Sequence, residues 1–221
     1  LVVGAGGLGS PAALYLASAG IGTLALADGD TVDATNLQRQ ILHRESSLGQ
    51  PKADSGRLRL NEINPECRVI PLVERLAGER LAEEIAAADV VLDCSDNFAT
   101  RHAINRACVQ HRKPLVSGAA IRFDGQVSVF DARRADAPCY HCLFPEGQDV
   151  EEIRCAVMGV FAPLTGIIGS VQAAEALKLL IGCGTSLAGR LLLLDGLAME
   201  WRSIAIPHDP ACPVCGSRGS A

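Results

Sequence analysis

The sequence lacks a dense cluster of positive charge. Its 20 Lys and Arg residues are outnumbered by 25 Asp and Glu, which gives a formal net charge of −5. Proteins that bind DNA or RNA present a basic surface to the phosphates. We therefore do not expect nucleic acid as a partner.

Long hydrophobic runs without charge are also absent. The longest apolar stretch, residues 163–182, carries Glu175 and Lys178 within it. This interruption predicts a buried or amphipathic helix instead of a membrane span. Nine cysteines are present without the spacing of a small disulfide scaffold, which favours a reducing compartment such as the cytoplasm.

No repeat, low-complexity tract or linker divides the 221 residues, of which 48% are hydrophobic. That content is sufficient for a core, so we expect one continuous domain. Its two halves would be a nucleotide-binding part, 1–131, and a second part, 132–221. Because the chain opens on Leu1 inside a strand-like run, we expect that it starts downstream of its natural beginning.

Strand-like and helix-like stretches alternate through the first half. Such alternation predicts βαβ crossovers and a doubly wound parallel sheet covered on both faces. The expected strands are 1–3, 23–27, 67–72, 89–93 and 113–117, and the expected helices are 10–19, 52–62, 79–88 and 99–111. The later stretch 190–206 resembles two strands joined by a tight turn, which predicts an antiparallel extension of this α/β sheet.

A glycine-rich turn follows the first strand. Gly4, Gly6 and Gly9 match the pattern G-x-G-x-x-G, with Gly7 beside them, and Asp28 ends the second strand about 20 residues on. Backbone N–H groups at such a turn bind phosphates, and the acid binds a ribose diol. The alternative is a tight turn with Asp28 as an ordinary strand cap.

Three further polar side chains follow the ribose-binding acid. Asn36 and Arg39 lie in one loop, and Lys52 begins the next helix. A dinucleotide pyrophosphate needs little beyond backbone amides, whereas a triphosphate brings charge that Arg and Lys neutralise. These residues therefore favour ATP.

A second acidic position lies after the strand 89–93. Asp96 and Asn97 would occupy the carboxyl edge of the sheet, where ligands of α/β proteins bind. Mg²⁺ is held by one or two carboxylates together with phosphates, so Asp96 is a candidate magnesium ligand. The alternative is that Asp96 and Asn97 only cap the following helix.

Two C-x₂-C pairs are the most specific local motif. Cys139 with Cys142, and Cys212 with Cys215, can supply four thiolates to one tetrahedral Zn²⁺. A redox role for one pair is the alternative, but redox pairs do not come doubled. We expect His141, between the first two ligands, to be exposed and not to join them.

Cys155 differs from the other cysteines because it lies beside Arg154 in an irregular segment. An exposed thiolate could be stabilised there, which makes Cys155 a candidate catalytic cysteine. An ordinary structural role is the alternative.

Taken in order, the motifs resemble those of a known family. The segments GAGGLGS, DGDTVDATNLQRQ, GQPKA, DCSDNFATR, CYHCLFPE and CPVCG are similar to those of the MoeB/ThiF adenylyltransferases, relatives of ubiquitin-activating enzymes. The resemblance implies a cytoplasmic homodimer that uses ATP and Mg²⁺ to adenylate the C-terminal Gly-Gly carboxylate of a small ubiquitin-like sulfur carrier. Pyrophosphate would be released, in molybdopterin or thiamine synthesis.

The resemblance also assigns roles to residues. Asp28 would bind the ribose; Asn36, Arg39 and Lys52 would orient the phosphates; and Asp96 would bind Mg²⁺. Cys155 would form a covalent sulfur link in some members. Family members usually carry an N-terminal arm with an arginine for the neighbouring subunit, and we expect this arm to be missing from residues 1–221.

No sulfurtransferase-like segment follows Cys215, so sulfur is expected from a separate protein.

Two other functions remain open on the residues alone. An NAD-dependent oxidoreductase would explain the glycines and Asp28 but leaves Asn36, Arg39 and Asp96 without roles. A non-catalytic, zinc-stabilised interaction module would retain a Rossmann-like fold without carrying out a reaction.

Overall fold

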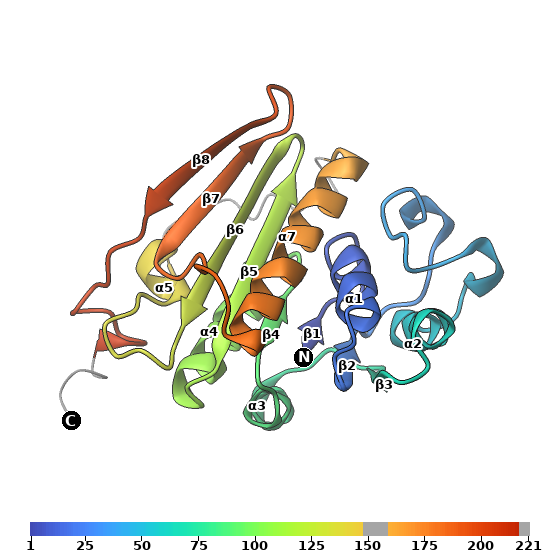
Figure 1. Cartoon of the computed structure of the whole chain (residues 1–221), viewed down its shortest axis with the longest axis horizontal. Coiled ribbons are helices and arrows are strands. Elements are labelled where there is room, and N and C mark those ends of the chain that lie inside the picture. The colour runs from blue at the N-terminus through green and yellow to red at the C-terminus, as the bar shows by residue number, and fades with distance from the viewer. Residues whose placement is uncertain (148–158, 217–221) are drawn as a thin grey trace.

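The structure is a computed structural model that describes residues 1–147 and 159–216. One mixed sheet runs through the described residues in the order β3-β2-β1-β4-β5-β6-β7-β8 (Figure 1). The strands are β1 (Val2–Val3), β2 (Thr23–Ala27), β3 (Arg68–Leu72), β4 (Val91–Asp93), β5 (Pro114–Ile121), β6 (Asp124–Asp131), β7 (Arg190–Asp195) and β8 (Glu200–Ala205).

Helices cover both faces of the sheet. Buried apolar side chains form two clusters that alternate along the strands other than β8, whose residues are exposed: Val2 belongs to the cluster with α1, α2 and α7, and Val3 to the cluster with α3, α4 and α5. This period of two is what a sheet buried on both sides requires. The helices are α1 (Gly9–Ser18), α2 (Lys52–Ile63), α3 (Gly78–Ala87), α4 (Phe98–Gln110), α5 (Tyr140–Leu143) and α7 (Ala162–Ile181).

Strands β1 to β5 are parallel, and β6, β7 and β8 are antiparallel additions. The predicted doubly wound sheet with an antiparallel extension is therefore confirmed. Strand β5 is longer than expected because its second half pairs with β6 across a tight hairpin. The short helix α5 follows β6 and was not among the expected helices.

The hairpin between β7 and β8 closes with side-chain help. Asp195 accepts the backbone N–H groups of Leu197 and Ala198 at 2.9 and 3.1 Å, and Met199 adopts a left-handed backbone with φ of 56°. A carboxylate at the start of a turn satisfies donors that the strand ladder leaves unpaired. The predicted tight turn is confirmed.

Helix α7 is the apolar stretch that the sequence singled out. By length and composition alone it is apolar enough to cross a membrane. It instead packs along α1 and over the sheet (Figure 1), where Gln172 and Glu175 are buried with hydrogen-bond partners. This arrangement is that of a helix within a folded domain.

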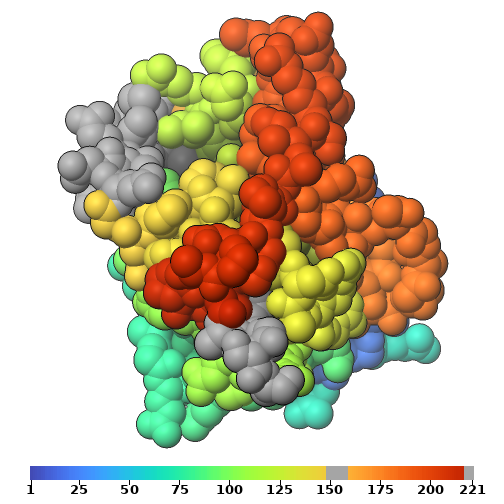
Figure 2. Space-filling model, turned by 90° about the vertical axis from the view of Figure 1, so that its left-hand side faces the viewer, coloured from blue at the N-terminus to red at the C-terminus, as the bar shows by residue number. Residues whose placement is uncertain are grey.

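The C-terminal segment returns to the middle of the chain. Figure 2 shows residues 206–216, in red, against the yellow segment that contains α5. This contact brings together the two C-x₂-C pairs.

Candidate nucleotide site and four-cysteine cluster

The predicted nucleotide residues converge on the switch point of the sheet. Strand β1 lies between β2 and β4, and all three run parallel. The loops that carry Gly4, Asp28 and Asp96 therefore leave the same edge, where ligands of open α/β sheets bind.

At two positions of the turn, contacts within the protein leave room for glycine only. Gly4 has a φ of +101°, and a Cβ there would lie 2.6 Å from the carbonyl oxygen of Cys94. A Cβ on Gly9 would lie 1.8 Å from the carbonyl oxygen of Gly4. Gly4 thus permits the turn and Gly9 permits the close approach of α1.

Gly6 has no such internal reason to be glycine. Its backbone is not left-handed, and a Cβ there would meet only the Gln40 amide nitrogen, at 3.6 Å. In dinucleotide-type loops the second glycine lets phosphates approach the backbone. The free space over Gly6 fits that use.

Helix α7 supports this loop from behind. A Cβ on Gly169 would lie 2.2 Å from the carbonyl oxygen of Leu8, so the two backbones touch. The side chain of Thr165 packs against Gly7. This support could not be predicted from the sequence, because no local pattern links 165–169 to the first ten residues.

Asp28 connects the second strand to the glycine loop. Its Oδ2 accepts the N–H of Ala5 at 2.8 Å, and its Oδ1 accepts the N–H of Asp30 at 2.8 Å. Each carboxylate oxygen can accept a further bond, so the side chain can hold the loop and a ribose hydroxyl together.

Lys52 is buried and paired. Its Nζ lies 3.4 Å from Oδ2 of Asp30, and Arg75 Nη2 lies 2.7 Å from Oδ1 of the same carboxylate. The hydrogen bond from Arg75, together with the charge of Lys52, lowers the pKa of Asp30 although partial burial opposes this. Asp30 and Arg75 were not predicted.

The charges of three acidic side chains act on Arg75. Its pKa is raised first by the hydrogen bond and charge of Asp30, and then by the charges of Asp28 and Asp96. The exposed Arg75 guanidinium thus bonds Asp30 and lies within electrostatic range of Asp28 and Asp96. Cations such as Mg²⁺ and Arg are suited to this rim.

Asn36 and Arg39 form a unit on the loop between β2 and α2. Arg39 Nη2 donates to Oδ1 of Asn36 at 2.7 Å, and Gln40 N donates to the carbonyl of Asn36. Gln40 is buried beside Gly6, and its Oε1 has no hydrogen-bond partner among the described residues. A buried amide oxygen without a partner is costly, and this one lies at the glycine loop.

His43 supports the glycine loop from the same segment. Its Nε2 lies 2.9 Å from the carbonyl oxygen of Ala5, and its Nδ1 lies 3.0 Å from Oγ of Ser55. Because a carbonyl only accepts, Nε2 carries the hydrogen and Ser55 donates to Nδ1. Burial lowers the pKa of His43, which keeps the ring neutral.

The loop after β4 is rigid beneath Asp96. The buried Asp93 accepts from Ser95 N and Oγ at 3.0 and 2.6 Å and from Ser117 Oγ at 2.9 Å. Asp96 is exposed at the tip. Asn97 caps α4, with its Oδ1 accepting Thr100 N at 2.9 Å, so the capping alternative holds for Asn97.

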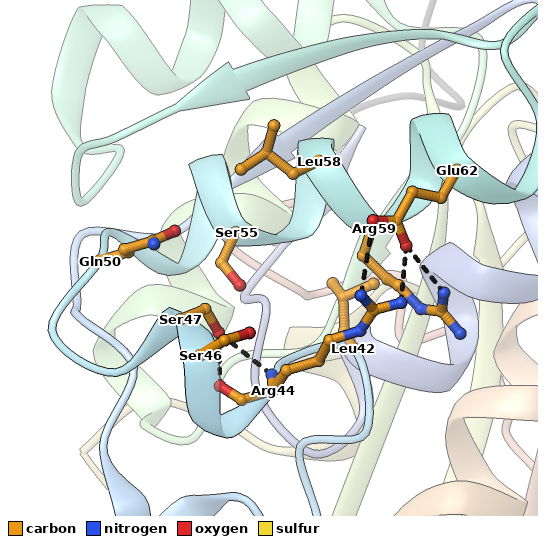
Figure 3. Close-up of a pocket in the computed structure, with 9 residues that line it drawn as sticks. All are labelled: Leu42, Arg44, Ser46, Ser47, Gln50, Ser55, Leu58, Arg59 and Glu62. Atoms are coloured by element: carbon orange, nitrogen blue, oxygen red, sulfur yellow. Dashed lines mark hydrogen bonds and ion pairs between the residues drawn. The ribbon is translucent and has the colours of Figure 1, made fainter.

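A pocket lies between α2 and the short helix η2 (Glu45–Ser47) (Figure 3). Arg44 and Arg59 both bind Glu62 at its rim. Ser55 lines the pocket and also bonds His43. None of the predicted nucleotide residues lines it, so it is separate from the predicted nucleotide site.

The two C-x₂-C pairs form one cluster. The Sγ atoms of Cys139 and Cys212 are 3.8 Å apart, those of Cys142 and Cys215 are 3.4 Å apart, and all four lie within 4.8 Å of one another. A tetrahedral ion with metal–sulfur bonds of 2.3 Å would hold its sulfurs about 3.8 Å apart. The predicted four-cysteine cluster is therefore present and fits a metal ion.

Asn105 on α4 holds the first knuckle in place. Its Oδ1 accepts Tyr140 N at 2.9 Å, and its Nδ2 donates to Cys139 Sγ at 3.6 Å. Such bonds orient a thiolate ligand. Asn105 was missed because it lies in an ordinary helix far from the cysteines in sequence.

His141 is half-buried and not exposed as expected, because it packs against the His102 ring at 5.8 Å between centroids. Cys155 lies outside the described residues.

Two relatives with about half of their residues identical to this chain are named adenylyltransferases. The ThiF family matches residues 1–214. The chain is 48% identical over 216 residues to the sulfur carrier protein ThiS adenylyltransferase of Escherichia coli, covering 98% of this chain and 85% of that protein. It is 46% identical over 219 residues to the molybdopterin-synthase adenylyltransferase of the same organism, covering 98% and 86%.

A solved structure shares the fold. The crystal structure of E. coli MccB with ATP superposes with a TM-score of 0.82 at 23% identity, covering 97% of this chain and 66% of the MccB chain. This chain thus spans just under two thirds of that structure's length. The likeness concerns the architecture alone.

Proposed function

This chain belongs to the ThiF family, and from that premise we propose that it adenylates the C-terminal Gly-Gly carboxylate of a small ubiquitin-like sulfur carrier. One observation carries the proposal. The glycine loop, Asp28 and the Asp96 loop meet at one sheet edge, in a chain nearly half identical to two adenylyltransferases of sulfur carriers or molybdopterin synthase.

The nucleotide would lie over the glycine loop. Backbone N–H groups near Gly6 and the N-terminus of α1 would bind phosphate oxygens, and Asp28 would accept the ribose hydroxyls. Arg39 and Lys52 would neutralise phosphate charge, with Asn36 holding Arg39. In this assignment Asp30 keeps Lys52 in place until the phosphates arrive.

Mg²⁺ would bind Asp96, where it would neutralise phosphate charge. The reaction needs no general base because the carrier's carboxylate is already ionised. An oxygen of this carboxylate forms a bond to the α-phosphorus of ATP. At the same time, the bond between the α-phosphorus and the oxygen that bridges it to the β-phosphorus breaks, and pyrophosphate leaves. The work of the chain is to position and neutralise the reactants.

The partner would be a carrier of the thiamine or molybdopterin type, with sulfur supplied by a separate protein. We propose a cytoplasmic homodimer in which residues 1–221 act as one adenylation domain. Leu197 and Ile204, exposed on the β7–β8 hairpin, offer surface for protein contact. Cys155 would take part in a later sulfur-transfer step and not in adenylation.

Zn²⁺ would occupy the four-cysteine cluster. Four thiolates close the coordination shell, so the ion would be structural. It would fasten the C-terminal segment to α5 and α4.

The test is ATP–pyrophosphate exchange. We expect exchange only when a carrier ending in Gly-Gly is present, and none with the same carrier lacking its last glycine. A parallel assay with thiamine-type and molybdopterin-type carriers assigns the pathway. Equal exchange with the truncated carrier would refute the proposed substrate.

A further inference from the structure

Three side chains that the proposed function does not use form a second cluster of metal-binding groups. They are His102 on α4, His141 on α5 and Glu146 just after α5. Their ligand atoms all lie within 4.8 Å of one another. The group lies next to the four-cysteine cluster but shares no ligand with it.

The Nδ1 atoms of both histidines lack a hydrogen bond to any of the described residues. His102 is buried, and its Nδ1 lies 3.7 Å from Glu146 Oε1. Nδ1 of His141 is buried and has no hydrogen-bond partner among the described residues. Leaving such an atom unpaired costs free energy, which a bound ion would recover.

Aromatic contacts hold the His102 ring in place. His102 makes edge contacts with Tyr140 at 5.2 Å and with His141 at 5.8 Å between ring centroids. Burial lowers the pKa of His102, with the charge of Glu146 opposing. A neutral imidazole is the form that binds a metal.

Arg106 is the group that opposes a cation here. It forms an ion pair with Oε1 of Glu146, the same oxygen that faces His102. Among residues 1–147 and 159–216, no hydrogen bond or ion pair involves Oε2 of Glu146, which leaves this oxygen as an acceptor for a metal while Arg106 keeps Oε1. Half of the Arg106 side chain is exposed, where solvent screens its repulsion.

We propose that His102, His141 and Glu146 form a second divalent transition-metal site, independent of the four-cysteine cluster. Two imidazole nitrogens and one carboxylate favour Zn²⁺, Co²⁺ or Ni²⁺ over Mg²⁺ or Ca²⁺. Three protein ligands leave a coordination position for water. The ion would tie α4 to the segment that follows α5, and it binds more weakly than the metal at the four thiolates.

The experiment titrates the full chain, stripped of metal, with Co²⁺. The first equivalent produces thiolate-to-metal charge-transfer absorption, and a second equivalent adds only weak ligand-field bands. His141→Gln and Glu146→Gln should weaken the second step by at least about tenfold and leave the charge-transfer absorption unchanged. His208→Gln, outside both clusters, is the matched control.

A variant with the opposite effect makes the test sharper. Arg106→Gln removes the competing cation and should tighten the second step. The proposal is overturned if only one Co²⁺ binds, or if a second binds with an affinity that His141→Gln, Glu146→Gln and Arg106→Gln all leave unchanged. Because Glu146 is exposed, its variant keeps the test valid even if His141→Gln misfolds.

Discussion

The carboxylate of Asp28 accepts the backbone N–H of Ala5 at 2.8 Å. This bond fastens the end of β2 to the glycine loop after β1, before any nucleotide is present. The other oxygen accepts Asp30 N, which fixes the start of the loop that leads to Arg39 and Lys52. One side chain thus organises both sides of the proposed site.

The first prediction concerns this carboxylate. Asp28→Asn removes the charge and one acceptor, so we expect ATP to bind about 10–100-fold more weakly, the equivalent of a hydrogen bond to a charged group. Calorimetric titration with ATP measures this. Asp33→Asn, which alters an exposed cap of the neighbouring turn (Ala34–Asn36), should leave the affinity unchanged; equal losses in both would remove Asp28 from the ribose site.

The second prediction separates two glycines of the loop. Gly6→Ala should fold with the stability of the unmodified chain, since its Cβ meets only a flexible amide at 3.6 Å, yet it should lose most ATP binding because the methyl occupies the phosphate face. Gly9→Ala should destabilise the fold by several kcal/mol, as overpacking does. Thermal unfolding and ATP titration of both variants decide; normal ATP binding by Gly6→Ala would contradict the assignment.

Most strands and helices could be predicted from sequence because each carries its own periodic pattern, whereas β6 and the four-residue helix α5 were not among the expected elements. The expected strand 23–27 matches Thr23–Ala27, and the cysteine pairs were identified by spacing alone. The supports of the site could not be found this way. His43, Gln40, Asn105 and Gly169 lie in ordinary helices or loops, and only the fold brings them beside the glycine loop or the cysteines. His141 was misjudged because its burial depends on His102, nearly 40 residues away.

The third prediction tests the magnesium ligand. Asp96→Ala should reduce ATP–pyrophosphate exchange by roughly 10²–10³-fold, the cost of removing one preorganised charge contact, while ATP binding falls much less. The asymmetry arises because the metal acts most on charge that develops during the reaction. Asn97→Ala removes a helix cap and should cost about 1 kcal/mol of stability instead. Unchanged exchange in Asp96→Ala would refute the metal role.

The fourth prediction concerns acid pH. His43 is buried with its pKa lowered by that burial; the Ala5 carbonyl and the Asp28 charge oppose the shift, and the Lys52 charge adds to it. Unfolded His binds a proton near pH 6.5, so below that pH the unfolded chain binds more protons and stability falls as pH decreases. His43→Gln should reduce this slope by at most about 1.4 kcal/mol per pH unit, the value for one proton.

Urea unfolding at pH 7.5, 6.5 and 5.5 measures that slope. Gln can still donate to the Ala5 carbonyl, so its variant should fold at pH 7.5. His208→Gln is the control and should keep the unmodified pH dependence. If His43→Gln and the unmodified chain lose stability equally on acidification, the neutral ring at His43 is not the cause.

The last prediction concerns the four-cysteine cluster. The purified chain should retain one zinc that resists a chelator, and Cys212→Ser should lose it, because three thiolates no longer close the shell. Structural zinc contributes on the order of 10 kcal/mol to folding in small domains, but here the ion fastens only the segments 139–144 and 206–216. We therefore expect hydrogen exchange to accelerate in those segments while β1, β2 and β4 keep their protection, and ATP binding to change less than threefold.

Cys183→Ser, which alters an exposed cysteine outside the cluster, is the matched control and should retain the metal. Full zinc occupancy in Cys212→Ser would exclude Cys212 from the ligand set, and loss of protection in β1 would show that the metal supports the whole fold.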